Sequence, residues 1–212
     1  MKPHAITHTF THAFIYLASQ SPRRAQLLAQ IGVRHELLLP DDGEDAEALE
    51  SALAGDLPLA YVQRVTLLKL HAAVARARRR ELPAAPILCA DTTVALGRRL
   101  LGKPQGAADA AASLQALSGR THRVLSCVAL ASGGQTWHAT SVSHVRFAPL
   151  PPATIKAYVA SGEPFGKAGA YAIQGPLAGW VQHIEGSHPG IMGLPLSETT
   201  QLLIKAGVEL AL

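Results

Sequence analysis

The chain has 212 residues and a mass of 22.3 kDa, which is enough for one domain, or a compact two-lobed one, with a substantial core. Its composition, 48% hydrophobic and 16% charged, excludes an intrinsically disordered protein. The net charge of +4 favours anionic partners in general. With only 5% aromatic residues, none interleaved with the basic ones, the chain lacks the stacking surface of a nucleic-acid binder.

The positions of the charged residues and the cysteines narrow the class of protein further. Much of the positive charge lies at one predicted helix end, at Arg76 and residues 78–80, which is typical of a solvated helix terminus. Cys89 and Cys127 lie in apolar segments without metal-ligand spacing or a disulfide pattern, which indicates a cytoplasmic protein. No apolar run is long enough to cross a membrane. Residues 1–13 lack the apolar core of a signal peptide, and we expect them to form a disordered extension.

The predicted elements alternate between strands and helices, which indicates an α/β fold. They are, in chain order, a strand at 14–18, a helix at 22–31, a strand at 34–39, an acidic loop at 40–56, a helix at 57–80, a strand at 87–90 that stays extended over 92–96, a helix at 106–117, a hairpin of 123–131 and 136–147, a helix from 151 to about 160, a strand at 179–184 and a helix at about 195–206. Asp56 is expected to cap the helix at 57–80, with Pro58 in its first turn. No repeat or linker divides the chain.

The segment 17–28 places two positive charges where the backbone disfavours them. Ser21 is a good N-cap and Pro22 suits the first helical position, so Arg23 and Arg24 fall in the first turn. The positive end of the helix dipole repels cations there by a few tenths of a kcal/mol. An anion such as phosphate beside the unpaired backbone N–H groups would reverse that penalty. The alternative is a pair of solvated surface arginines.

A lysine also stands in an unusual place on the helix at 57–80. At 100° per residue, Lys69 falls on the apolar stripe formed by Val62, Val65 and Ala72. Its ammonium group either extends along the surface into solvent or points at an anion in a cleft.

The candidate catalytic acid is Asp91, which follows the apolar run at 87–90. Ligands of open α/β sheets bind beyond the carboxyl ends of strands, so a carboxylate at this point suits catalysis or metal binding. Thr92 and Thr93 add hydroxyl groups, and Lys103 lies twelve residues after Asp91 in a rigid Gly-Lys-Pro turn. The alternative is that Asp91 serves only as a turn or capping residue.

Two loops supply further candidates. The acidic loop could contribute one carboxylate that holds Mg²⁺ together with Asp91 and phosphate oxygens, although loop carboxylates are usually just solvated; its acids are Asp41, Asp42, Glu44, Asp45 and Glu47. The Gly-rich stretch at 162–175 allows close approach of the backbone to a ligand. Within it, Lys167 adds a cation, and the amide of Gln174 could read the edge of a nucleobase.

Together these stretches resemble the Maf family of nucleotide pyrophosphatases. The matching stretches, in the order of the family, are LASQSPRRAQLL, LCADTTVALGRRLLGKP, LSGRTHRV, GKAGAYAIQG and IEGSHPGIMGLPL. The resemblance implies a single domain over 14–212, with a mixed sheet, flanking helices and two lobes around a central cleft, related to the inosine triphosphate pyrophosphatases. It also implies a cytoplasmic homodimer that hydrolyses nucleoside triphosphates to the monophosphate and pyrophosphate with a divalent metal, Mg²⁺ or Mn²⁺.

The family's functional positions carry over residue by residue. Ser19, Arg23 and Arg24 match the phosphate-binding segment, and Lys69, Asp91 and Lys103 match the helical lysine, the catalytic acid and the lysine of the turn. Glu44 matches the acidic position after the second strand and would hold the metal with Asp91. Thr92 and Gln174, with Arg23, match positions tied to substrate choice. Whether Asp91 acts mainly as base or mainly as metal ligand stays open.

The branch of the family is indicated by the segments AGAYAIQG and IEGSHPGIMGLPL, which look like those of enzymes that hydrolyse dTTP and UTP. Two positions depart from the pattern: Gln26 replaces a usual Glu, and residues 187–190 replace a usual Ser-Tyr-Asn-Val. The alternatives are a pyrophosphatase for 7-methyl-GTP and a nucleotide-sensing regulator of cell division without turnover.

Overall fold

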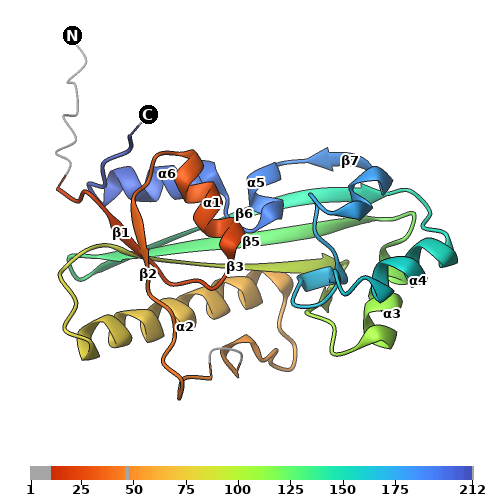
Figure 1. Ribbon diagram of the computed structural model, residues 1–212, viewed down its shortest axis with the longest axis horizontal. Helices are drawn as coiled ribbons and strands as arrows, with labels where there is room; N and C mark the ends of the chain where they lie inside the picture. The colour runs from red at the N-terminus through yellow and green to blue at the C-terminus, as the bar shows by residue number, and fades with distance from the viewer. Residues whose placement is uncertain (1–10, 46–47, 212) are drawn as a thin grey trace, which may run out of the picture.

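The computed structural model describes residues 11–45 and 48–211 and shows a mixed sheet flanked by helices on both faces (Figure 1). The α/β fold predicted from the sequence is therefore confirmed. The strands are β1 (Ile15–Leu17), β2 (His35–Leu37), β3 (Ile87–Leu96), β4 (Arg99–Leu101), β5 (Thr121–Ser132), β6 (Gln135–Phe147) and β7 (Val181–Glu185). The α-helices are α1 (Pro22–Gln30), α2 (Pro58–Arg79), α3 (Ala107–Leu117), α4 (Pro152–Ala160), α5 (His188–Met192) and α6 (Leu196–Lys205). Short 3₁₀ turns form η1 (Ala48–Glu50), η2 (Ala168–Ala170) and η3 (Pro176–Trp180).

The sheet has the strand order β2-β1-β3-β5-β6-β7, and β4 pairs with the far end of β3. β1 runs parallel to both β2 and β3, whereas the remaining pairs are antiparallel. Side chains alternate between the two faces of a strand, so β3 serves two cores. Leu88 and Ala90 pack with α1 and α6, while Cys89 packs with α2 on the opposite face. Asp91, by the same alternation, faces α2.

A further core lies at the other end of the long strands. It joins Phe147 of β6 and Leu114 of α3 with Tyr158 of α4 and Tyr171. In Figure 1, α3 and α4 lie at one end of the molecule, and β1, β2 and α6 lie toward the other. The middle of β3 therefore runs between two separately packed regions.

Two local predictions were wrong. Leu57, not Asp56, is the N-cap residue of α2; the Asp56 carboxylate instead accepts a hydrogen bond from the Leu53 N–H (2.9 Å) and pairs with Arg64. β3 is also one unbroken strand, so Asp91 lies inside it and not at its end. Residues that follow Asp91 keep their pairing with β5, because the antiparallel ladder between β3 and β5 extends from Ile87 to Ala95.

The predicted N-terminal extension falls largely outside the described residues, which begin at Thr11. The backbone N–H groups of Thr11 and His12 donate to the Gly207 carbonyl, and the His12 carbonyl accepts from Glu209. Among the described helices, none is long and apolar enough to span a bilayer.

Candidate functional site

The site forms where β3 loses a neighbour. β1 pairs with β3 only as far as Leu17 opposite Leu88, and β4 joins β3 at Val94. Between these pairings, the described part of the chain leaves the edge of β3 at Asp91 open. A cavity of about 690 Å³ occupies this gap and reaches both faces of the sheet, a volume suited to a small-molecule ligand. Ligands of open α/β sheets bind beyond the carboxyl end of a strand, and here that strand is β1, the parallel neighbour of β3.

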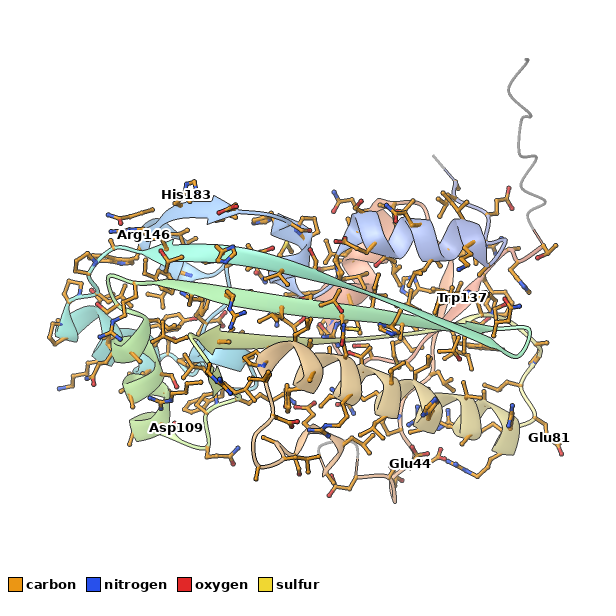
Figure 2. The ribbon with its side chains drawn as sticks, turned by 180° about the vertical axis from the view of Figure 1, so that it is seen from behind. Glu44, Glu81, Asp109, Trp137, Arg146 and His183 are labelled. Carbon is orange, nitrogen blue, oxygen red and sulfur yellow. The ribbon has the colours of Figure 1, made fainter. Side chains whose placement is uncertain are left out.

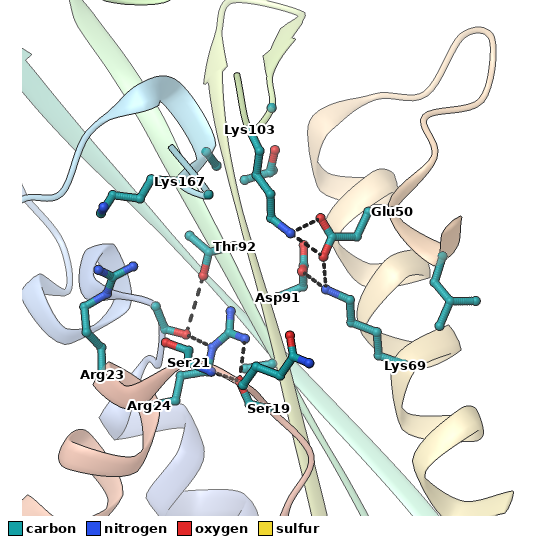
Figure 3. Close-up of a pocket in the computed structure, with 18 of the residues that line it drawn as sticks. Ser19, Ser21, Arg23, Arg24, Glu50, Lys69, Asp91, Thr92, Lys103 and Lys167 are labelled. Carbon is teal, nitrogen blue, oxygen red and sulfur yellow. Dashed lines mark hydrogen bonds and ion pairs between the residues drawn. The ribbon is translucent and has the colours of Figure 1, made fainter. Parts of the chain in front are cut away.

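Four charged side chains form a chain of ion pairs in this gap (Figure 3). The Nζ of Lys69 lies 2.6 Å from Oδ1 of Asp91 and 2.7 Å from Oε1 of Glu50. The Nζ of Lys103 lies 2.8 Å from Oε2 of Glu50. α2 supplies Lys69, β3 supplies Asp91, η1 supplies Glu50, and the turn after β4 supplies Lys103. Two carboxylates and two lysines thus meet from four separate segments.

The environment keeps Lys69 and Glu50 charged. Burial opposes the charge on Lys69, but the carboxylates of Asp91 and Glu50 outweigh it and raise the lysine pKa. Burial likewise acts against ionised Glu50, yet Lys69 and Lys103 lower its pKa overall. Lys69 therefore does not extend into solvent: it stays on the buried face of α2 because two anions meet it there.

The first turn of α1 lines a second wall of the cavity. Ser21 is the N-cap and Pro22 begins the helix, as predicted, although no side-chain hydrogen bond closes the cap. Arg24 donates from Nε to the Gly193 carbonyl (2.9 Å) and from Nη1 to the Ser19 hydroxyl (3.1 Å). Burial lowers the pKa of Arg24, against the opposing pull of Asp91. Arg23 also lines the cavity, on the side where Figure 3 shows Lys167.

The other face of β3, on which α1 also packs, adds apolar side chains to the cavity lining. Thr92 lies there, one residue from Asp91 but on the opposite side of the strand. Its Oγ1 is 2.8 Å from the Oγ of Ser126 on β5. Around it the cavity is lined by Val94, Tyr171, Ile173, Ile191 and Met192.

Eight of the nine predicted site residues line this single cavity: Ser19, Arg23, Arg24, Glu44, Lys69, Asp91, Thr92 and Lys103. The ninth, Gln174, is exposed and is not among the lining residues. Glu44 lines the cavity but contacts Arg76 and Arg79 rather than Asp91.

Sequence reasoning missed Glu50. It lies in the acidic loop, where nothing in its local sequence distinguishes it from its solvated neighbours. The signal that could have found it is Lys69, because a lysine on a buried helix face needs a carboxylate partner. Tyr61 of α2 was also missed; its hydroxyl donates to the Glu50 carbonyl (2.8 Å) and helps to hold η1 against the helix.

The donor atoms at the site fit a hard divalent cation. Among the described residues, no group of three or more His, Cys, Asp or Glu could hold a metal by itself. Mg²⁺ needs only one or two carboxylates when phosphate oxygens and water complete its octahedron. Asp91 and Glu50 both contact the ammonium group of Lys69, so these two carboxylates are placed to bind one metal ion together. Glu44 would have to leave its arginines to join them.

Comparisons with known proteins all indicate the same protein family. The sequence pattern of the family described as Maf-like protein matches residues 14–206. The chain is 60% identical over 197 residues to a dTTP/UTP pyrophosphatase of Polaromonas, and the matched residues make up 93% of this chain and 98% of that protein. It is 59% identical over 196 residues to one of Albidiferax ferrireducens, covering 92% and 98%. It is 60% identical over 200 residues to one of Ralstonia nicotianae, covering 94% and 97%.

Proposed function

Because this chain belongs to the Maf family, we propose that it is a nucleotide pyrophosphatase that hydrolyses dTTP and UTP to the nucleoside monophosphate and pyrophosphate. The observation that carries the proposal is the position of Asp91, a carboxylate held by Lys69 inside a cavity rich in basic side chains. Relatives of similar length that carry the name dTTP/UTP pyrophosphatase support the choice of substrate.

The cavity has the charge that a polyphosphate requires. Among the described residues, six basic side chains line it against four acidic ones; the basic ones are Arg23, Arg24, Lys69, Arg76, Lys103 and Lys167. A triphosphate carries about four negative charges near neutral pH, and fixed cations that meet those charges cost no reorganisation during the reaction. Lys69 and Lys103 are already held in place by Glu50, so they are oriented before substrate arrives.

Asp91 is assigned to the attacking water. Its Oδ1 accepts from Lys69, so Oδ2 is the oxygen that would take the hydrogen bond of that water. The water oxygen forms a bond to the α-phosphorus as the bond from that phosphorus to the bridging oxygen breaks. The bridging oxygen leaves with the electron pair as part of pyrophosphate, and the water proton passes to the carboxylate. Lys103, Arg23 and Arg24 would stabilise the charge that develops on the departing pyrophosphate.

A divalent metal is part of the proposal. Asp91 would hold Mg²⁺ or Mn²⁺, together with Glu50 or with Glu44, and the bound ion would supply Lewis-acid polarisation of the phosphoryl oxygens. Removal of divalent ions with EDTA should abolish pyrophosphate release, and added Mg²⁺ or Mn²⁺ should restore it. Full activity in EDTA would remove the metal from the proposal. We also propose a cytoplasmic homodimer, as expected from the sequence.

The decisive experiment is product analysis with Asp91→Asn. The wild type should convert dTTP to dTMP and pyrophosphate, and the variant should lose about 10²- to 10³-fold in kcat, the usual cost of one well-placed catalytic group. Asp42→Asn, which changes an exposed acid of the acidic loop outside the cavity lining, is the matched control and should keep full activity. Release of dTDP and inorganic phosphate, or unchanged turnover by Asp91→Asn, would contradict the proposal. Turnover of a nucleotide panel that includes 7-methyl-GTP distinguishes the dTTP/UTP enzymes from the 7-methyl-GTP branch of the family. Tight binding of a triphosphate without any product would favour a nucleotide-sensing regulator.

A further inference from the structure

The Gly-rich segment contains a turn whose backbone conformation is unfavourable. Gly169 and Ala170 both have a positive φ, +69° and +60°. Glycine adopts this left-handed region freely, but the Cβ of alanine makes it costly, so Ala170 keeps it only because its surroundings impose it. Ala170 is fully buried, and its N–H donates to the Lys167 carbonyl (3.0 Å). Contacts on both sides of the turn hold it in this conformation.

One of these contacts ties the turn to Lys103. The N–H of Gly169 donates to the carbonyl of Gly102 (3.1 Å), the residue before Lys103. A Cβ atom at Gly169 would lie 2.9 Å from the side chain of Val94, so the turn packs directly on β3. Glycine allows both the positive φ and this close approach. The position of the turn therefore sets the position of the backbone from which the Lys103 side chain starts.

The second contact lies at Tyr171, directly after the turn. Its hydroxyl oxygen is 2.7 Å from Nε2 of His122 on β5, and the two side chains are 6% and 2% exposed. Both rings also pack against Phe147, and the centroids of Tyr171 and Phe147 are 4.9 Å apart. A hydrogen bond that is shielded from water and joins two packed rings restrains both of them. β5 thus fixes the end of the turn.

We propose that Tyr171 is a positioning residue, which through its hydrogen bond to His122 holds the left-handed turn against β3 and so places Lys103 in the cavity. Glu50 also contacts Lys103 (2.8 Å), but that contact restrains the ammonium end of a flexible side chain. The contact with Gly169 restrains its backbone end. The inference rests on the proposed function, in which Lys103 stabilises the departing pyrophosphate, and adds the means by which a hydrogen bond in the core would support that role.

The first test is a double-mutant cycle between Tyr171 and Lys103. Tyr171→Phe removes only the hydroxyl, and we expect kcat/KM for dTTP to fall about tenfold, the worth of one hydrogen bond. The fall should come mostly from kcat, because Lys103 meets charge that develops in the transition state. In the background of Lys103→Met, the same change should have less than about a twofold effect, since the group that Tyr171 positions is already gone. Unchanged kcat/KM in Tyr171→Phe, or an equal fall in both backgrounds, overturns the inference.

Ser118→Ala is the matched control for loss of stability. The Oγ of Ser118 accepts from the Leu150 N–H (2.7 Å), and Leu150 belongs to the same core as Tyr171, but neither Ser118 nor Leu150 lines the cavity. Urea unfolding should show lower stability in both variants, whereas only Tyr171→Phe should lose activity. An equal fall in kcat/KM in Ser118→Ala overturns the inference, because any weakening of this core would then slow turnover.

The second test uses amide exchange and does not depend on turnover. The Gly169 N–H, protected by the Gly102 carbonyl, should exchange at least about tenfold faster in Tyr171→Phe than in the wild type or in Ser118→Ala. His122→Phe removes the same hydrogen bond from β5 and keeps a packed ring, so it replaces Tyr171→Phe in both tests if that variant fails to fold. Unchanged exchange overturns the inference while leaving the proposed pyrophosphatase intact, whereas absence of dTTP turnover in the wild type contradicts the proposed function.

Discussion

Glu50 has an unusual position for a residue of an acidic loop, because it contacts two lysines that point at the same cavity. Its carboxylate lies 2.7 Å from Lys69 and 2.8 Å from Lys103, and Lys69 in turn contacts Asp91. Replacement by glutamine keeps the size of the side chain but removes the charge that orients both ammonium groups. We expect Glu50→Gln to lower kcat/KM for dTTP by about 10- to 100-fold, the usual cost of losing a supporting group around a phosphate or metal site.

The measurement is steady-state hydrolysis of dTTP alongside thermal unfolding of the same preparation. Asp42→Asn removes an acid from the same loop without touching either lysine and should retain wild-type kinetics. Glu50→Gln with unchanged kcat/KM would show that the lysines hold their places without this carboxylate.

His122 gives a prediction about pH that concerns stability and not turnover. The side chain is 2% exposed, its Nε2 lies 2.7 Å from the Tyr171 hydroxyl, and burial lowers its pKa to about 4. The unfolded chain, with an ordinary histidine pKa of about 6.5, binds the proton more tightly, so this residue's contribution is complete above pH 6.5 and is lost as the pH falls toward 4. Between pH 7.5 and pH 5 the loss is about 2 kcal/mol.

Urea unfolding at pH 7.5 and at pH 5 checks this. His122→Gln does not titrate, so the difference in its unfolding free energy between the two pH values should be smaller than that of the wild type by about 2 kcal/mol. His183→Gln, which removes an exposed histidine, should keep the wild-type difference. Parallel behaviour of His122→Gln and the wild type would mean that His122 is not held neutral in the fold.

At the level of single residues, the sequence revealed those charged side chains whose local position is energetically unfavourable without a partner. Arg24 in a first helical turn and Lys69 on an apolar stripe each need an opposite charge or acceptor, and the structure supplies one to both. Glu50 gave no such signal, because an acid in an acidic loop costs nothing until the fold brings Lys69 to it. Gln174 was predicted from its amide group and from its match to the family pattern, but whether a side chain lines a cavity depends on packing that the sequence does not show.

Among the elements, α2 does more than cover the sheet, because its C-terminal end holds the acidic loop. Arg76, Arg79 and Arg80 pair with Glu44 and Asp41, and Arg76 is buried (Figure 2 labels Glu44 beside α2). The interpretation of this helix end as solvated therefore holds for residues 78–80, which are exposed, and was wrong for Arg76. Arg76 also donates to the Leu38 carbonyl at 3.0 Å, which ties the strand end before the loop to the helix.

We expect Arg76→Met to lower the unfolding free energy by about 2 kcal/mol, because it leaves the Leu38 carbonyl and Glu44 without a buried donor. Urea unfolding measures the loss. Arg79→Met removes a half-exposed arginine that shares Glu44, and the loss should be clearly smaller. Equal losses of unfolding free energy in the two variants would indicate that the stability depends on the positive charge at the helix end and not on the burial of Arg76.

Element boundaries were predictable where local signals mark them and not elsewhere. Proline at the first helical position gave the starts of α1 and α2 to within one residue. The end of β3 at Leu96 agrees with the extended stretch predicted over 92–96. Its continuity through Asp91 had no local mark, since Asp91 interrupts an apolar run without interrupting the pairing with β5. The three-residue β4 was missed because its arginine and leucines resemble a loop until they pair with Val94 to Leu96.

On the scale of the whole molecule, the cavity lies between regions that pack separately, and its walls come from both. Ser19 and Arg24 belong to the part built around β1 and α1, whereas Tyr171 and Ile173 belong to the core with α3 and α4. A ligand that contacts both walls binds the folded chain and not the unfolded one, so it must stabilise the fold. Because six basic side chains line the cavity among the described residues, we expect a triphosphate to have the largest effect.

Asp91→Asn makes this measurable, because it should bind dTTP and hydrolyse it only very slowly. At a concentration 100 times its dissociation constant, dTTP with Mg²⁺ should stabilise the variant by about 2.7 kcal/mol, or about 5 to 10 °C in Tm for a chain of this size. dTMP, which lacks the charges that Lys103 and Arg23 would meet, should produce a much smaller shift at the same concentration. High salt should reduce the dTTP shift through screening of these partly exposed charges. Equal shifts with dTTP and dTMP would place the recognition in the nucleoside alone and leave the basic wall of the cavity without a role in binding.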